Sequence, residues 1–206
     1  MSALEIAPLA ARDLGAAREL LARAFQENPL NRAVVGGSAA RRLLCNRAGM
    51  RTFLGPALAV GRALGARAAP GEPLLGALVA LPPGVGPLPR ASFASLLQLL
   101  VVQGAGVIRR WSAIADALQL HRPQAPHAYL ATLGVAPDVQ RRGVGSALLR
   151  RWLAEIDERR ERAYLETDRA ENAAWYASAG FRTRAEIVLL GVTVHLLERP
   201  PRGQGP

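Results

Sequence analysis

The sequence predicts one α/β domain of the α+β type over residues 1–199. With 206 residues, half of them apolar, the chain is long enough for a single well-packed core. Two pairs of strand-like segments, at 57–81 and 181–197, are each joined by a short turn, as in antiparallel hairpins. Between them, an apolar strand at 128–135 runs through a glycine-containing loop into an amphipathic helix. Strands and helices are interleaved along the chain, without an internal repeat.

The first segments follow in the order strand, helix, helix and hairpin. Alternating apolar residues predict a short strand at 4–9, and apolar residues at helical spacing predict a helix from Leu14 that ends near Asn28–Pro29. A second helix is predicted from Ser38 to Phe53. The first hairpin then joins a strand at 57–68 to a strand at 74–81 through an Ala-Pro-Gly-Glu turn.

Residues 91–120 predict a helical insertion before the next strand. A Pro/Gly-rich spacer at 82–90 precedes two amphipathic helices, at 91–102 and 106–120, which are joined by a glycine-containing link. The stretch 91–108 is uncharged and long enough to be considered as a membrane span. Its serine, glutamine and glycine residues, and the helical spacing of its apolar residues, favour a soluble amphipathic helix instead.

The loop after the strand at 128–135 is suited to bind a pyrophosphate. Residues 140–146 read Gln-Arg-Arg-Gly-Val-Gly-Ser, and a helix is predicted from 144 to 161. Gly143 and Gly145 let backbone N–H groups approach a ligand with no Cβ in the way. These N–H groups lie at a helix start, where the dipole favours negative charge. The loop lacks the Gly-Lys-Ser/Thr of a Walker loop and the third glycine of a dinucleotide fingerprint.

The C-terminal part predicts a strand, a short helix and a closing pair of strands. A strand starts at Tyr164–Glu166, and a helix follows from Asn172, its expected N-cap, to Ala179. Strands at 181–190 and 192–197 then pair around Gly191. The tail at 200–206 is expected to be disordered.

The composition argues against several classes of protein. The net charge is +10, but every basic residue is arginine, so the charge reflects a compositional bias and is weak evidence for nucleic acid. Cys45 is the single cysteine, and the three histidines, His121, His127 and His195, lack metal-ligand spacing. The N-terminus has no signal-peptide pattern. We therefore expect a cytoplasmic protein without a metal, and without nucleic-acid or membrane partners.

Two motifs resemble the GNAT superfamily of acyltransferases. Gln140-Arg141-Arg142-Gly143-Val144-Gly145, after a strand, resembles the acyl-CoA-binding signature Gln/Arg-x-x-Gly-x-Gly/Ala. Leu165-Glu166-Thr167-Asp168, then Asn172 to Tyr176, then Ala179-Gly180-Phe181 resembles the family's strand, Asn-x-x-x-Tyr and Gly-Phe block. The order of elements matches over about residues 4–199. The resemblance implies a GNAT fold: a mixed, mostly antiparallel sheet, splayed at the acyl-CoA site, with a two-helix insertion before the signature strand.

The resemblance also implies how acetyl-CoA, the expected co-substrate, is bound. Where the strands splay, the pantetheine arm pairs with unpaired backbone groups at Leu133 and Val135, like an added strand. An N–H group there polarises the thioester carbonyl. The pyrophosphate meets the N–H groups between Arg141 and Ser146, and either arginine can pair with a phosphate. The expected cofactor-binding residues are Leu133, Gly134, Val135, Gln140, Arg141, Arg142, Gly143, Val144, Gly145, Ser146, Asn172 and Tyr176.

The resemblance indicates a general acid but only weakly a general base. Tyr176 lies one helical turn after Asn172, and in relatives this hydroxyl often protonates the departing CoA thiolate; the alternative is a core aromatic. The position that carries a catalytic glutamate in some histone-modifying relatives aligns with Tyr129. Glu27, near the expected acceptor side, and His127, whose pKa range suits a base, are the remaining candidates, beside a water relay.

These patterns together predict an N-acyltransferase that moves acetyl from acetyl-CoA to a primary amine of a small molecule or peptide. Both substrates bind together and the amine attacks the thioester directly, without a covalent intermediate at Cys45. The alternative is a module of the same fold that binds acyl-CoA as a sensor without turnover. The 91–120 helices are expected either to form a wall or lid of the acceptor site or only to stabilise the sheet. A monomer or a homodimer is expected.

Overall fold

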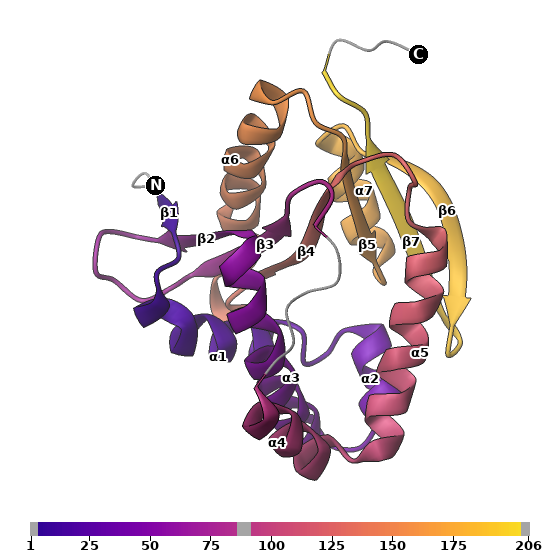
Figure 1. Ribbon diagram of the computed structural model, residues 1–206. Helices are drawn as coiled ribbons and strands as arrows, with labels where there is room; N and C mark the ends of the chain where they lie inside the picture. The colour runs from indigo at the N-terminus through magenta and orange to yellow at the C-terminus, as the bar shows by residue number, and fades with distance from the viewer. Residues whose placement is uncertain (1–3, 86–91, 203–206) are drawn as a thin grey trace.

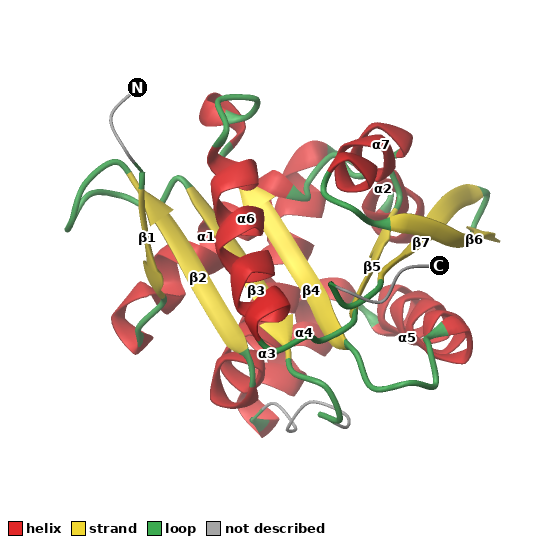
Figure 2. Ribbon diagram, turned by 90° about the horizontal axis from the view of Figure 1, so that it is seen from above, coloured by secondary structure: helices red, strands yellow, loops and turns green. Residues whose placement is uncertain are grey.

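The computed structural model describes residues 4–85 and 92–202, and these form a seven-stranded sheet with helices on both faces (Figures 1 and 2). All neighbouring strands are antiparallel except β4 and β5, which are parallel. In spatial order the strands are β1 (Glu5–Pro8), β2 (Arg62–Arg67), β3 (Gly76–Leu81), β4 (Ala128–Val135), β5 (Ala163–Thr167), β7 (Val192–Arg199) and β6 (Arg182–Leu189). This confirms the predicted mixed, mostly antiparallel sheet.

The helices cover the sheet in two layers. One face packs against α6 and α7 in the largest core cluster, and the other packs against α1 and α3 near β2 and β3 and against α2 and α5 near β5 and β7. In Figure 2, α6 crosses in front of β2, β3 and β4. The helices are α1 (Leu14–Ala24), α2 (Pro29–Val35), α3 (Ala39–Val60), α4 (Phe93–Gln103), α5 (Ala105–His121), α6 (Val144–Glu158) and α7 (Ala170–Ser178).

Helix α6 forms because its sequence is apolar on one face. Its residues Leu148, Leu149, Trp152, Leu153 and Ile156 recur at helical spacing, and all five are buried against the sheet. A bidentate salt bridge between Arg62 on β2 and Glu155 on α6 joins the helix to the sheet. The helix therefore holds its N-terminal turn in a fixed position at the end of β4.

Strands β4 and β5 separate after only two residue pairs. Ala128 pairs with Ala163 and Tyr129 with Tyr164, and the remainder of β4 has no ladder partner on the β5 side. The register between β3 and β4 also shifts between Val79 and Ala80, so Leu130 and Leu133, three residues apart, both pack against the α6 cluster. The splayed sheet that the resemblance implied is thus present in the fold.

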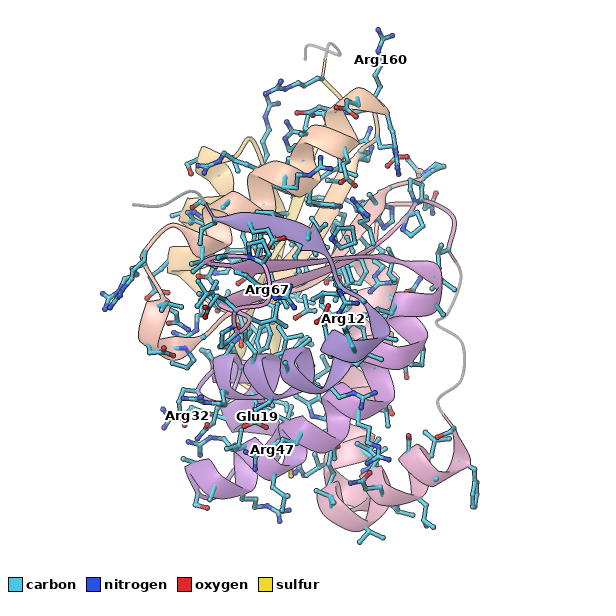
Figure 3. All side chains as sticks on the ribbon, turned by 90° about the vertical axis from the view of Figure 1, so that its left-hand side faces the viewer. Arg12, Glu19, Arg32, Arg47, Arg67 and Arg160 are labelled. Atoms are coloured by element: carbon cyan, nitrogen blue, oxygen red, sulfur yellow. The ribbon has the colours of Figure 1, made fainter. Side chains whose placement is uncertain are left out.

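Surface and buried ion pairs join the helices to one another and to the sheet. Figure 3 shows Glu19 of α1 beside Arg47 of α3, whose guanidinium makes two hydrogen bonds to the carboxylate. Both side chains are about half exposed, so the pair contributes little to stability. The pair formed by Arg67 of β2 and Asp13 is largely buried and anchors the start of α1 to the sheet.

The N-terminal boundaries differ from the sequence prediction. The predicted strand at 57–68 begins only at Arg62, because α3 continues through Pro56 to Val60. Leu54 and Ala57 are fully buried against α1 and the sheet, and this packing offsets the hydrogen bond that proline removes. The first helix ends at Ala24, before the predicted end near Asn28–Pro29, and Pro29 instead occupies the first turn of α2, a helix that the sequence did not predict.

The insertion forms the two predicted helices, but α4 does not bury its apolar stripe. Phe93, Leu96, Leu97, Leu100 and Val101 are all exposed, whereas Val107 and Ile114 of α5 are buried against α2 and α3. Among residues 4–85 and 92–202, no helix is both long and apolar enough to cross a membrane. Parts of the 82–90 spacer and of the 200–206 tail, namely 86–90 and 203–206, lie outside the described residues, as does Ala91.

Candidate active site

The loop between β4 and α6 presents the start of a helix whose backbone N–H groups have no acceptor in the helix. Gly143 precedes α6 with φ +84, and Arg141 also has a positive φ, of 61°. The first helical bond runs from the Ala147 N–H to the Gly143 carbonyl, and no side chain caps this end. The N–H groups of Val144, Gly145 and Ser146 are therefore available to an anion.

The two glycines of this loop serve different purposes. A Cβ on Gly143 would meet no atom within 4 Å, so glycine is favoured there by its left-handed backbone. A Cβ on Gly145 would contact Leu133 and Val135 at 3.5 Å, an ordinary van der Waals distance. A Cβ on Gly145 would thus point toward β4, and the expectation that both glycines leave space for a ligand stays a prediction.

Other loop residues either hold the loop in place or remain open to solvent. Gln140 donates from Nε2 to the Val135 carbonyl at 3.2 Å, and Trp175 of α7 donates from Nε1 to Ser146 Oγ at 3.3 Å. Arg141 and Arg142 are exposed, and within the described part of the chain no acid pairs with either one. Their guanidinium groups are free to meet phosphate oxygens.

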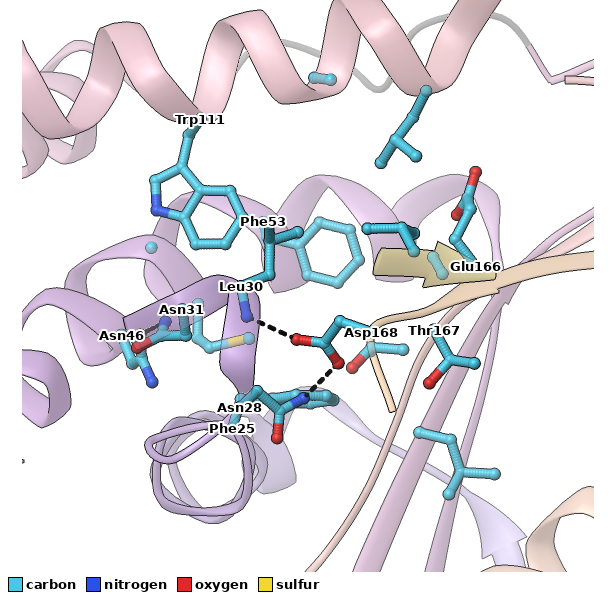
Figure 4. Close-up of a pocket in the computed structure, with 18 of the residues that line it drawn as sticks. Phe25, Asn28, Leu30, Asn31, Asn46, Phe53, Trp111, Glu166, Thr167 and Asp168 are labelled. Atoms are coloured by element: carbon cyan, nitrogen blue, oxygen red, sulfur yellow. Dashed lines mark hydrogen bonds between the residues drawn. The ribbon is translucent and has the colours of Figure 1, made fainter. Parts of the chain in front are cut away.

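On the opposite side of the splay lies a cavity of about 730 Å³. Its floor is formed by β4 and by the end of β5, and its walls come from α2, α3, α4 and α5 (Figure 4). No residue of the 140–146 loop lines it. The ends of β4 and β5 at the gap thus line a cavity that the 140–146 loop does not line.

Tyr176 and Asn172 both line this cavity from α7. Tyr176 is 7% exposed and packs against Trp175 and Phe181, with ring centroids 4.7 and 5.7 Å away. Burial raises the pKa of Tyr176, so its hydroxyl stays protonated at neutral pH. Asn172 does not cap the helix as expected, because α7 begins two residues earlier, at Ala170. Its side chain lies in the first turn of α7.

Glu166, which the sequence reading did not select, lines the same cavity from β5. Its side chain is 7% exposed, and Oε1 lies 3.6 Å from Nε of Arg122, too far for a hydrogen bond. Burial raises its pKa, and the neighbouring hydroxyls of Tyr129 and Tyr164 and the charge of Arg122 act in the opposite direction. A charged residue inside the apolar strand Tyr-Leu-Glu-Thr was the signal that could have identified it.

The two base candidates selected from the sequence lie outside the lining of this cavity. Glu27 accepts a hydrogen bond of 2.6 Å from Nη2 of Arg42, and its side chain is half exposed. His127 packs edge-on against Tyr164, with ring centroids 5.4 Å apart, and burial lowers its pKa. Neither side chain is brought to the β4–β5 gap with Tyr176 and Glu166.

A second carboxylate in the cavity, Asp168, is already occupied. Its Oδ2 accepts the backbone N–H of Leu30 at 2.8 Å, and its Oδ1 accepts from Asn28 at 3.4 Å (Figure 4). Leu30 lies in the first turn of α2, so Asp168 caps that helix from a loop 138 residues further along the chain. This contact fixes α2 as a wall of the cavity.

The described residues contain no group of three or more His, Cys, Asp and Glu side chains placed to hold a metal ion. Cys45 lines the cavity, and burial raises the pKa of its thiol. Glu166 and Tyr176 bring a carboxylate and a tyrosine hydroxyl to the same cavity.

Comparisons with known proteins agree with this geometry. A family model described as an acetyltransferase (GNAT) domain matches residues 98–183. A Corynebacterium glutamicum structure described as "histone acetyltransferase HPA2 and related acetyltransferase" is 21% identical over 100% of both chains, with a TM-score of 0.71. Arylalkylamine N-acetyltransferase 2 from Aedes aegypti is 12% identical over 96% of this chain and 98% of that one, with a TM-score of 0.64.

A third structure contains the cofactor itself. The paia N-acetyltransferase from Thermoplasma acidophilum, in complex with coenzyme A, is 12% identical over 96% of this chain and 99% of that one, with a TM-score of 0.58. These structures share the fold of this chain, and the acetyltransferase (GNAT) domain model matches its residues 98–183.

Proposed function

We propose that this protein transfers acetyl from acetyl-CoA to a primary amine by direct attack of the amine on the thioester. The observation that carries the proposal is the position of the β4–β5 gap, between an anion-binding loop and a cavity that contains a carboxylate and a tyrosine. Such a gap lets the cofactor enter from one side and the acceptor from the other. Positioning the two reactants together accounts for most of the expected acceleration.

The cofactor is held mainly by backbone groups in this proposal. The N–H groups of Val144, Gly145 and Ser146, with Arg141 and Arg142, bind the pyrophosphate. The unpaired edge of β4 around Leu133 binds the pantetheine amides, and an N–H group there polarises the thioester carbonyl. The Val135 carbonyl already accepts from Gln140, so Val135 offers its carbonyl less freely than the sequence reading assumed.

We assign the general base to Glu166 and the general acid to Tyr176. A buried carboxylate with a raised pKa takes a proton from an incoming ammonium more readily than an ordinary glutamate does. The hydroxyl of Tyr176, kept protonated by burial, supplies a proton to the departing thiolate. The raised thiol pKa of Cys45 keeps that group protonated and supports attack without an acyl-enzyme.

Steady-state release of CoA thiol over a panel of primary amines tests the proposal. Turnover above the rate of acetyl-CoA hydrolysis supports an enzyme. If calorimetry detects acetyl-CoA binding but no amine increases thiol release, the alternative holds, a GNAT-fold module that binds acyl-CoA as a sensor. If neither binding nor turnover is found, the proposed cofactor site is wrong. Cytoplasmic location and a monomeric or homodimeric state remain predictions beside it.

A negative charge placed at Gly143 should weaken cofactor binding without damaging the fold. Asparagine and aspartate both tolerate the left-handed backbone at this position, and both favour a helix N-cap. We expect Gly143→Asp to weaken CoA binding at least tenfold, about 1.4 kcal/mol, because a negative charge then faces the pyrophosphate. Gly143→Asn caps the same N–H groups and is the matched control.

Thermal unfolding with and without CoA measures this effect. Ligand at 100 times Kd should stabilise the wild-type protein by about 2.7 kcal/mol. Gly143→Asp should lose at least about half of this stabilisation, while its ligand-free Tm stays equal to that of Gly143→Asn or rises. Equal CoA affinity in the two variants would contradict phosphate binding at this helix start.

A further inference from the structure

We infer that the acceptor is a primary amine attached to an uncharged, ring-sized apolar body, and that it carries no second cationic group. The inference rests on the proposed function, since it names the class of amine that the cavity accepts. It excludes polyamines and other multiply charged acceptors. The argument comes from the lining of the cavity, its charged groups and its volume.

The walls of the cavity are mainly apolar and partly aromatic. Phe25, Phe53 and Trp111, which are labelled in Figure 4, contribute aromatic surface to the lining. Met50 and Leu118 add aliphatic surface from α3 and α5. At about 730 Å³, the cavity is in the range of pockets that enclose small organic ligands. Contact between these apolar walls and water is unfavourable, and a ring-sized apolar group would remove that surface from water.

Among the described residues, two charged side chains line the cavity, and both are carboxylates. Asp168 caps α2 through Leu30 and accepts a second hydrogen bond from Asn28, but it keeps its negative charge. Glu166 accepts no hydrogen bond at Oε1, so it is the more available partner for an incoming ammonium. Both carboxylates come from the end of β5, so the cavity offers a single place for positive charge. A second ammonium on the acceptor would lie among apolar walls without a partner.

The far side of the cavity offers amide groups instead of charge. Asn31 donates to Asn46, Asn46 donates to the Ala22 carbonyl, and Gln103 donates to the Cys45 carbonyl. Each of these three side chains is at most 7% exposed. These bonds hold α2, α3 and α4 together, and although Asn31 Oδ1 accepts no hydrogen bond, the three amides carry no charge to pair with a second ammonium.

The insertion determines this selectivity because it supplies one wall. Leu99 and Gln103 of α4, and Ile108, Trp111 and Leu118 of α5, line the cavity. The same helix α5 buries Val107 and Ile114 against α2 and α3, so it also stabilises the fold. Residues 91–120 can therefore both form a wall of the acceptor site and stabilise the fold, and removal of the whole insertion would not separate these two roles. Point substitutions at positions that face the cavity separate them.

Two matched pairs of amines test the apolar body and the single charge separately. Full burial of a phenyl ring predicts that kcat/KM for 2-phenylethylamine exceeds that for ethylamine by about 10- to 100-fold. Pentane-1,5-diamine differs from pentylamine by one additional ammonium, and its kcat/KM should be at least about tenfold lower. Calorimetry of the same four amines with the enzyme–CoA complex measures their binding independently of turnover.

A new carboxylate in the wall should reverse the preference between the last two amines. Ser112 on α5 lines the cavity and is exposed, whereas the adjacent Ala113 is exposed and does not line it. We expect Ser112→Glu to raise the kcat/KM of the diamine relative to pentylamine by about tenfold, since it gives the second ammonium a partner. Ala113→Glu adds the same charge outside the cavity and should leave the ratio unchanged.

The outcomes separate this inference from the proposed function. The inference is wrong if kcat/KM for ethylamine equals that for 2-phenylethylamine, or if kcat/KM for pentane-1,5-diamine equals that for pentylamine. Either result would leave the proposed acetyl transfer intact. If no amine is turned over, acetyl transfer fails, and calorimetric binding of the four amines still decides whether the cavity prefers a single charge on an apolar body. An unchanged diamine ratio in Ser112→Glu would also count against the inference, provided that the variant unfolds at the wild-type temperature.

Discussion

Replacing Tyr176 with phenylalanine is expected to lower kcat by about 10²–10⁴-fold while leaving the affinity for acetyl-CoA nearly unchanged. The hydroxyl is the single group that differs, and phenylalanine keeps the contacts of the ring with Trp175 and Phe181. The stability of the variant should be close to that of the wild type, because the ring of Tyr176 packs in the main core cluster and phenylalanine keeps that ring. Stopped-flow or quenched-flow measurement of the chemical step, with CoA affinity from calorimetry, checks the result.

The pH dependence of the Tyr176→Phe variant sharpens this prediction. Burial raises the pKa of Tyr176, so the wild-type hydroxyl remains protonated throughout the neutral range and causes no loss of activity on the alkaline side of that range. The variant should therefore be slower by the same factor at every pH between about 6 and 9. An unchanged kcat in a reaction limited by chemistry would reduce Tyr176 to a packing residue. A raised KM for acetyl-CoA would point to a binding role.

Glu166→Gln is the second substitution with a large expected effect. If Glu166 takes the proton from the acceptor ammonium, the amide should lower kcat/KM for the amine by about 10²–10⁴-fold without changing CoA binding. In the wild-type enzyme, kcat/KM should rise with pH through the raised pKa of Glu166, and the variant should lose that rise. Glu158→Gln, on the exposed side of α6, is the matched control.

The same substitution should change stability in the opposite direction to activity. Burial raises the pKa of Glu166 above its unfolded value, so the folded state holds the proton more tightly than the unfolded state. The wild-type contribution to stability is therefore largest at acid pH and is lost as pH rises through the folded pKa. Glu166→Gln should be at least as stable as wild type at neutral pH, with the difference shrinking below the ordinary glutamate pKa.

Denaturant unfolding at two pH values measures this difference. A variant that is less stable at neutral pH and equally stable at acid pH would show that the pair with Arg122 outweighs the cost of burial. In that case the role of Glu166 would be to hold the end of α5 in place. If Glu166→Gln also retained activity, Glu166 could not be the general base. Lost activity together with gained stability is the signature expected of a functional buried charge.

The sequence by itself determined the cofactor half of this protein. Strand β4 spans residues 128–135 as predicted, and α6 begins at Val144, because alternation, helical spacing and a left-handed glycine are local properties of the chain. The resemblance of residues 140–146 and 165–181 to the GNAT motifs placed the splay correctly, since those motifs lie at the elements that form it. The elements that form the proposed acyl-CoA site could therefore be predicted from local sequence patterns.

Tertiary structure alone decided the acceptor half. Glu27 looked available in the sequence, but Arg42, fifteen residues away, takes its carboxylate. In the sequence, Glu166 is only one position of the Leu-Glu-Thr-Asp motif. In the structure, it is buried beside Arg122, Tyr129 and Tyr164, and this burial makes it a candidate base. Asp168 caps a helix that lies 138 residues earlier, and Pro56 stays inside a helix because its neighbours are buried. Each outcome depends on contacts between distant segments, and no local pattern encodes such contacts.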